Sequence, residues 1–124
     1  MANGRLMRAL LFAPALALIS TGACAEGPGA EVFKKNCAIC HTVEAGKNKI
    51  GPSLADVVGR KAGSVAGFAY SAANKNSGDT WDEQTLDAYL TAPQKFMPGT
   101  KMVFAGLKNP PDRQALIEYL KEHR

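Results

Sequence analysis

The pentapeptide Cys-Ala-Ile-Cys-His at residues 37–41 limits the folds open to this chain more than any other feature of its 124 residues. Two thiols at this spacing, those of Cys37 and Cys40, can form thioethers with the two vinyl groups of a haem, and the adjacent imidazole of His41 can ligate the iron. A chain that carries this motif has to fold around a large, flat and mainly apolar group. The motif therefore predicts one covalently attached haem c.

The segment after the motif is poor in regular structure. Residues 42–77 are interrupted by glycine and proline at Gly46, Gly51, Pro52, Gly59, Gly63 and Gly67. Long helices or strands cannot form through so many breakers. A loop segment of this length is unusual in a compact domain, unless a cofactor provides the surface against which the loops pack.

Three segments outside this stretch have apolar residues at helical spacing, and strand patterns are absent. They are residues 30–40, residues 82–91 and a last helix that begins at Pro110 or Pro111 and ends at Glu122. The candidate N-caps are Thr80 or Asp82 for the second segment and Asn109 for the third. The sequence therefore predicts an all-α fold of three main helices, with loops wrapped around the haem.

Residues 1–25 predict a cleavable signal peptide. Two arginines precede an apolar run at residues 9–19, and small residues follow as far as Ala25. The run is about half the length of a transmembrane helix, so no membrane span is expected. Cleavage after Ala25 would leave residues 26–124 as a monohaem domain in the periplasm. The alternative is a lipid anchor on Cys24, although Thr21 occupies a position where lipoprotein signals usually have a branched aliphatic residue.

Charge indicates the kind of partner. The formal net charge of +4 falls to +2 when Arg5 and Arg8 leave with the leader, a balance that argues against nucleic-acid binding. Lysines flank the segments expected to contact the haem, namely Lys34, Lys35, Lys47, Lys49, Lys95, Lys101 and Lys108. This distribution favours acidic protein partners, although a solvated surface of mixed charge would give the same pattern.

Other uses of the two cysteines fit less well. A disulfide or a thioredoxin-like redox pair would need a strand-helix context, which the sequence lacks. A zinc site would need further ligands, and beyond the motif the predicted mature chain offers only His123 as an imidazole donor. Haem attachment is the interpretation that accounts for both the motif and the predicted export.

The second axial ligand of the iron has three candidates after the motif, Met97, Met102 and His123. His123 lies at a helix end next to the C-terminus, where a solvated residue is expected. Both methionines lie in one loop and either could simply fill the core. Met102 follows the Pro98-Gly99 turn and could point back across the haem, which favours it modestly.

The chain resembles the class I cytochromes c of mitochondria and of the bacterial periplasm over about residues 29–122. The matching stretches are CAICHTVEAG, GPSL, GRKAG, GFAYSAANKN, the lone Trp81, AYLTAPQKF, PGTKMVFAG and LIEYLK. The resemblance implies His41 and Met102 as axial ligands, with the Pro52 carbonyl accepting from the His41 ring. It implies that Tyr89 hydrogen-bonds the methionine sulfur. It also places Arg60, Tyr70, Asn74, Trp81 and Thr100 around the haem, and Gly29, Phe33, Leu116 and Tyr119 where the first and last helices cross.

The resemblance further implies a function. An iron with a ligand on each face has no open position, so an electron carrier is expected rather than an enzyme. The implied partners are acidic redox proteins such as a cytochrome bc complex and a terminal oxidase or photosynthetic reaction centre. This chain itself is expected to be a soluble monomer in the periplasm. The alternatives are a haem c subunit of a membrane respiratory complex and a ligand-sensing or peroxidase-like haem protein.

Overall fold

The computed structural model describes residues 27–124, which form an all-α fold, as the sequence predicts. The helices are α1 (Pro28–Asn36), α2 (Ala72–Asn76), α3 (Glu83–Thr91), α4 (Pro93–Phe96) and α5 (Pro110–Glu122). Among these residues there is no strand, and Lys61 and Thr80 form only an isolated antiparallel bridge. The three longer helices, α1, α3 and α5, correspond to the three expected segments. Residues 1–26, which include the predicted signal peptide and Cys24, lie outside the described part of the chain.

Helix α1 ends at Asn36, four residues before the end that the sequence pattern predicts. The backbone N–H groups of Cys37 and Ala38 both donate to the Phe33 carbonyl, over 2.8 and 3.0 Å. The N–H of His41 then donates to the Cys37 carbonyl over 2.9 Å. The motif therefore forms a tight turn. The apolar pattern continues to Cys40 because Cys37 and Cys40 line a cavity. The pattern therefore extends beyond the regular helix, which ends at Asn36.

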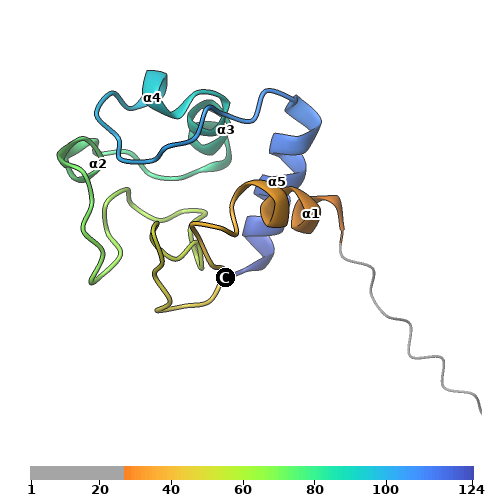
Figure 1. Cartoon of the computed structure of the whole chain (residues 1–124), viewed down its shortest axis with the longest axis horizontal. Helices are drawn as coiled ribbons and strands as arrows, with labels where there is room; N and C mark the ends of the chain where they lie inside the picture. The colour runs from red at the N-terminus through yellow and green to blue at the C-terminus, as the bar shows by residue number, and fades with distance from the viewer. Residues whose placement is uncertain (1–26) are drawn as a thin grey trace, which may run out of the picture.

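Helices α1 and α5 cross at close range, with the orange α1 against the blue α5 in Figure 1. Gly29 makes this approach feasible, because a Cβ atom at that position would overlap the Ala115 carbonyl oxygen and the Cβ of Tyr119. Farther along, the rings of Phe33 and Tyr119 pack with centroids 5.4 Å apart, and Leu116 is fully buried. The predicted crossing residues therefore meet as expected.

The two predicted caps have different outcomes. The Asp82 carboxylate accepts from the Thr85 N–H over 2.7 Å at the N-terminus of α3, so Asp82 and not Thr80 is the cap. Asn109 occupies the predicted N-cap position of α5, but its side chain makes no capping hydrogen bond. The first two residues of α5 are Pro110 and Pro111, which have no N–H groups, and this leaves few donors for a cap to satisfy.

The core lies between α3, α5 and the aromatic residues around them. The Tyr89 ring packs against Trp81 and Phe96, with centroids 4.8 and 5.8 Å away. The buried apolar residues are Phe33, Val57, Ala62, Trp81, Leu86, Tyr89, Leu90, Met97, Leu107, Leu116, Ile117 and Leu120. No helix within residues 27–124 combines the length and the apolar character needed to cross a bilayer.

The loop segment 42–71 lies on the opposite side of the molecule from α3 and α4 (Figure 1). It is held by backbone hydrogen bonds to distant residues. The Gly59 N–H donates to Trp81 O over 2.7 Å, and the Asp56 N–H donates to His123 O over 2.8 Å. Irregular backbone is thus fixed opposite the helices, and the space between the two sides forms the site described next.

Candidate haem site

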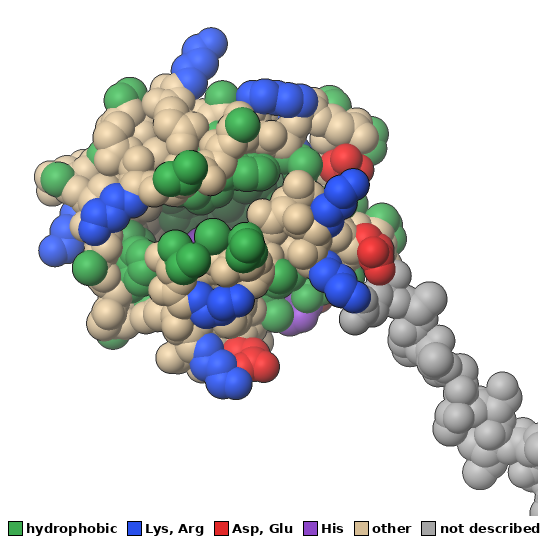
Figure 2. Space-filling view, viewed as in Figure 1, with side chains coloured by type: hydrophobic (Ala, Val, Ile, Leu, Met, Phe, Trp, Pro, Cys, Tyr) green, Lys and Arg blue, Asp and Glu red, His purple; other side chains and the backbone are tan. Residues whose placement is uncertain are grey.

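A cavity of about 470 Å³ separates the loop segment from α3 and from the segment after α4. Figure 2 shows it as a hollow with apolar side chains on its walls and Lys and Arg side chains at several points around the opening. Its volume is within the range of roughly 300–1,000 Å³ that is typical of ligand and cofactor sites. It is lined by all ten site residues expected from the sequence: Cys37, Cys40, His41, Arg60, Tyr70, Asn74, Trp81, Tyr89, Thr100 and Met102.

The turn after α1 brings the two cysteines to the cavity. Both are free thiols, so the disulfide alternative is not realised in this structure. Burial raises the pKa of the Cys37 thiol to about 11, and the neighbouring Cys40 adds to that shift. The Cys37 sulfur is therefore protonated at neutral pH in the haem-free chain.

His41 is held in one orientation by its second ring nitrogen. Its Nδ1 lies 2.7 Å from the Pro52 carbonyl oxygen, which can only accept, so Nδ1 carries the proton and Nε2 has a free lone pair. Burial lowers the pKa of His41, and the positive charges of Arg60 and Lys49 lower it further, whereas the hydrogen bond to Pro52 acts in the opposite direction. A neutral, oriented imidazole at the cavity wall is the form that ligates a metal.

Met102 reaches the same cavity from the loop after the Pro98-Gly99 turn. The Tyr89 hydroxyl donates to the Met102 sulfur over 3.3 Å and lies 3.3 Å from the Thr100 hydroxyl. Because the Tyr89 proton points to sulfur, Thr100 donates to Tyr89, and the Thr100 oxygen accepts the Met102 N–H over 3.3 Å. Burial raises the pKa of Tyr89, so its hydroxyl stays protonated and remains a donor. The thioether is thus held by a small hydrogen-bond network.

The other two candidate iron ligands lie elsewhere. Met97 is 4% exposed and belongs to the hydrophobic core, and His123 bonds the Tyr119 carbonyl through Nδ1 over 2.7 Å at the C-terminus. Neither is among the residues that line the cavity. Within residues 27–124, no group of three or more His, Cys, Asp or Glu side chains is placed to hold a metal ion.

Polar atoms without partners show that the cavity suits a group with polar substituents. Arg60 donates through Nη1 to the carbonyls of Ser53 and Ala55, but its buried Nε has no protein partner. The buried Oδ1 of Asn74 is also unpaired. Buried donors and acceptors are nearly always satisfied, so these two atoms indicate polar groups supplied from the cavity. Together with two thiols, an imidazole and a thioether, they fit a haem.

Several residues of the site were not predicted from the sequence. Gly51 lies against the His41 ring, where any Cβ would overlap the imidazole, and Lys101 Nζ donates to the Ala69 carbonyl over 3.0 Å and so ties the Met102 loop to the loop segment. Three large apolar side chains that line the cavity are exposed: Ile39 (77%), Ile50 (76%) and Val103 (99%). The glycine directly before Pro52 was a usable signal for the close approach to His41. The exposure of the isoleucines follows only from the tertiary structure.

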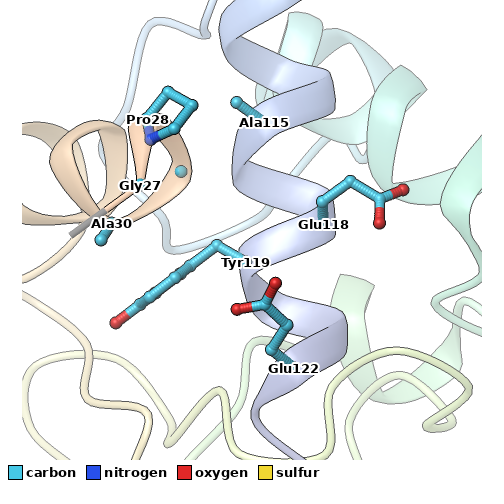
Figure 3. A pocket seen from close by; sticks show the side chains of 8 residues that line it. Gly27, Pro28, Ala30, Ala115, Glu118, Tyr119 and Glu122 are labelled. Atoms are coloured by element: carbon cyan, nitrogen blue, oxygen red, sulfur yellow. The ribbon is translucent and has the colours of Figure 1, made fainter. Parts of the chain in front are cut away.

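A second, smaller hollow of about 260 Å³ lies beside the α1–α5 crossing (Figure 3). It is lined by Gly27, Pro28, Gly29, Ala30, Ala115, Glu118, Tyr119 and Glu122. None of the predicted site residues is in this group. The chemistry of the motif is therefore confined to the larger cavity.

The fold and the cavity together define a class, namely small helical proteins that enclose a covalently attached haem. Comparison with known proteins gives the family: the cytochrome c family model matches residues 27–124, and the chain belongs to this family. Membership implies one covalently attached haem c and a role in electron transport rather than in catalysis.

The similarity to individual members is high. The chain is 62% identical over 85 residues to cytochrome c2 iso-2 of Magnetospirillum molischianum, and the aligned region covers 68% of this chain and 88% of the relative. It is 56% identical over 95 residues to the cytochrome c of Arabidopsis thaliana, with 76% and 85% covered. Its structure is similar to that of cytochrome cH from Methylobacterium extorquens, with a TM-score of 0.73 and 46% identity over 77% of this chain and 95% of that one.

Proposed function

We propose that this chain is an exported electron carrier whose haem iron is ligated by His41 and Met102, and that it moves single electrons between acidic protein partners in the periplasm. The observation that carries the proposal is the cavity, which brings two thiols, a neutral imidazole and a hydrogen-bonded thioether to its walls. Haem bound there supplies a one-electron iron(II)/iron(III) couple.

The chain's own residues would set the properties of that couple. The His41–Pro52 hydrogen bond fixes the imidazole, and the Tyr89 hydroxyl withdraws electron density from the Met102 sulfur. A weak donor and an apolar cavity both disfavour the extra positive charge of the ferric state, so they raise the midpoint potential. The ordered Met102 thioether would take the sixth coordination position of a bound haem iron, which favours electron transfer over the ligand-sensing and peroxidase-like alternatives.

The opening of the cavity supports contact with protein partners. Ile39, Ile50 and Val103 expose apolar surface at this edge, and Figure 2 shows basic side chains at several points around it. An apolar centre surrounded by positive charge suits a brief complex with an acidic redox protein, such as a cytochrome bc complex and then a terminal oxidase or a photosynthetic reaction centre. Small contact areas of this kind allow rapid release.

The proposal is tested on the full chain, expressed in a bacterial host that is competent in cytochrome maturation. Mass spectrometry of the exported protein should give the mass of residues 26–124 plus one haem, and a lipid on Cys24 would give a different mass. The ferric spectrum should show the weak long-wavelength band of methionine ligation. A colourless product at the bare peptide mass would contradict haem attachment, and a haem protein without that band would contradict the role of Met102.

A further inference from the structure

Arg113 is a buried charge that the site described so far does not use. It lies in the first turns of α5 and is only 8% exposed. Its Nε donates to Asp87 Oδ1 of α3 over 2.7 Å, and its Nη1 donates to the carbonyls of Leu107 and Lys108 over 2.9 and 3.2 Å. One planar guanidinium thus joins two helices to the backbone that leads out of the Met102 loop.

The same backbone is held from its other side. The Leu107 N–H donates to the Leu90 carbonyl over 2.7 Å, and Lys108 Nζ donates to the Thr91 carbonyl over 2.6 Å. Gly106 adopts φ +110°, and a Cβ there would overlap the Thr91 carbonyl. Residues 106–108 are therefore fixed against the C-terminal end of α3.

The loop between this fixed point and Met102 is short. Val103 is almost fully exposed, so it adds little packing of its own. Met102 is held at the near end by Tyr89 and by Gln94 Nε2, which donates to the Met102 carbonyl over 2.5 Å. The position of the sulfur thus depends on contacts at both ends of this loop, and Arg113 is one of the groups that fix the far end, through the carbonyls of Leu107 and Lys108.

We propose that Arg113 is a positioning residue for the thioether: by bonding the backbone of residues 107–108 to Asp87, it keeps the Met102 sulfur at the haem against competing ligands. The inference rests on the proposed ligation by Met102. A lysine at this position could keep the charge, but its single ammonium cannot reproduce the planar geometry of a guanidinium that bonds Asp87 and two carbonyls at once.

Imidazole binding to the ferric holoprotein tests this role, because imidazole must displace the methionine to bind the iron. We expect Arg113→Lys to bind imidazole about tenfold more tightly than the wild type, equivalent to about 1.4 kcal/mol, and to weaken the methionine band. Arg113→Met, which keeps the bulk but has no donors, should show a larger shift. If Arg113→Met does not fold, the imidazole affinity of Arg113→Lys alone tests the positioning role.

Lys121→Gln is the matched control. Lys121 is also on α5 and its Nζ pairs with Glu83 of α3 over 2.6 Å, but it makes no bond to residues 107–108. Its loss should change imidazole affinity by less than about twofold, as expected of an exposed ion pair. Equal shifts in Arg113→Lys and Lys121→Gln, or no shift in either, would overturn the positioning role. The wild-type spectrum tests Met102 ligation by itself, so a failure of the proposed function is recognised separately.

Discussion

At the scale of single residues, the two methionines of one loop have opposite environments. Met102 reaches the cavity and accepts a hydrogen bond from Tyr89, whereas Met97, five positions earlier, is buried in the core. Both side chains have the same chemistry, so composition cannot separate their roles. The Pro98-Gly99 turn between them reverses the chain and sends one sulfur to the cavity and the other to the interior.

Substitution of each methionine should therefore have a different effect. Met102→Ala should lower the midpoint potential and let cyanide bind to the ferric iron, because the sixth position loses its thioether. Met97→Ala should leave both properties nearly unchanged but reduce the free energy of unfolding by about 2–5 kcal/mol, the usual cost of a large-to-small change in a core. Redox titration, cyanide binding and denaturant unfolding measure the three quantities. Equal effects of the two variants on potential and cyanide binding would refute the ligand assignment.

At the scale of elements, the α1–α5 crossing depends on one small residue. Gly29 lies against the Ala115 carbonyl oxygen of α5 with no room for a side chain. Because a methyl group would push the helices apart, Gly29→Ala should lower the free energy of unfolding by about 1–3 kcal/mol. Gly27→Ala is the matched control, since a Cβ at that position meets no atom within 4 Å and should cost little. Similar denaturation midpoints for both variants would contradict this close packing.

The start of α3 gives a pH-dependent prediction. The Asp82 carboxylate caps the helix, and its hydrogen bonds with the Thr85 backbone and side chain lower its pKa. A lowered pKa means that the stabilisation is present above the unfolded-state pKa and is lost as the pH falls through the lower folded-state value. The wild type should thus be more stable than Asp82→Asn at pH 7, and the difference should shrink below about pH 4. Urea unfolding of both proteins at several pH values measures it. A constant difference would exclude the charge as its origin.

At the scale of the whole molecule, the distribution of charge matters more than its small net value. Basic side chains lie at several points around the opening of the cavity (Figure 2). Their attraction for an acidic partner is screened over about 10 Å at moderate ionic strength. The second-order rate of electron transfer to an acidic redox partner should therefore fall as salt is added, as measured by stopped-flow absorbance. A rate that does not change with salt would reject steering by lysines.

The sequence predicts those features of the fold and of the site that are encoded by residues close together along the chain. The motif at residues 37–41 specifies the attachment chemistry because its spacing is a property of consecutive residues. The three main helices follow from the apolar periodicity, and the resemblance to class I cytochromes c supplied the remaining residues of the site. All ten line one cavity.

What the sequence did not reveal depends on contacts between distant residues. The contact of Gly51 with the His41 ring and the bonds of Arg113 arise where separate segments meet. The sequence by itself determined the cofactor chemistry and the helices, because both are encoded over a few neighbouring residues. Only the tertiary structure showed which side chains hold Met102 at the cavity, because packing places groups together that are far apart along the chain.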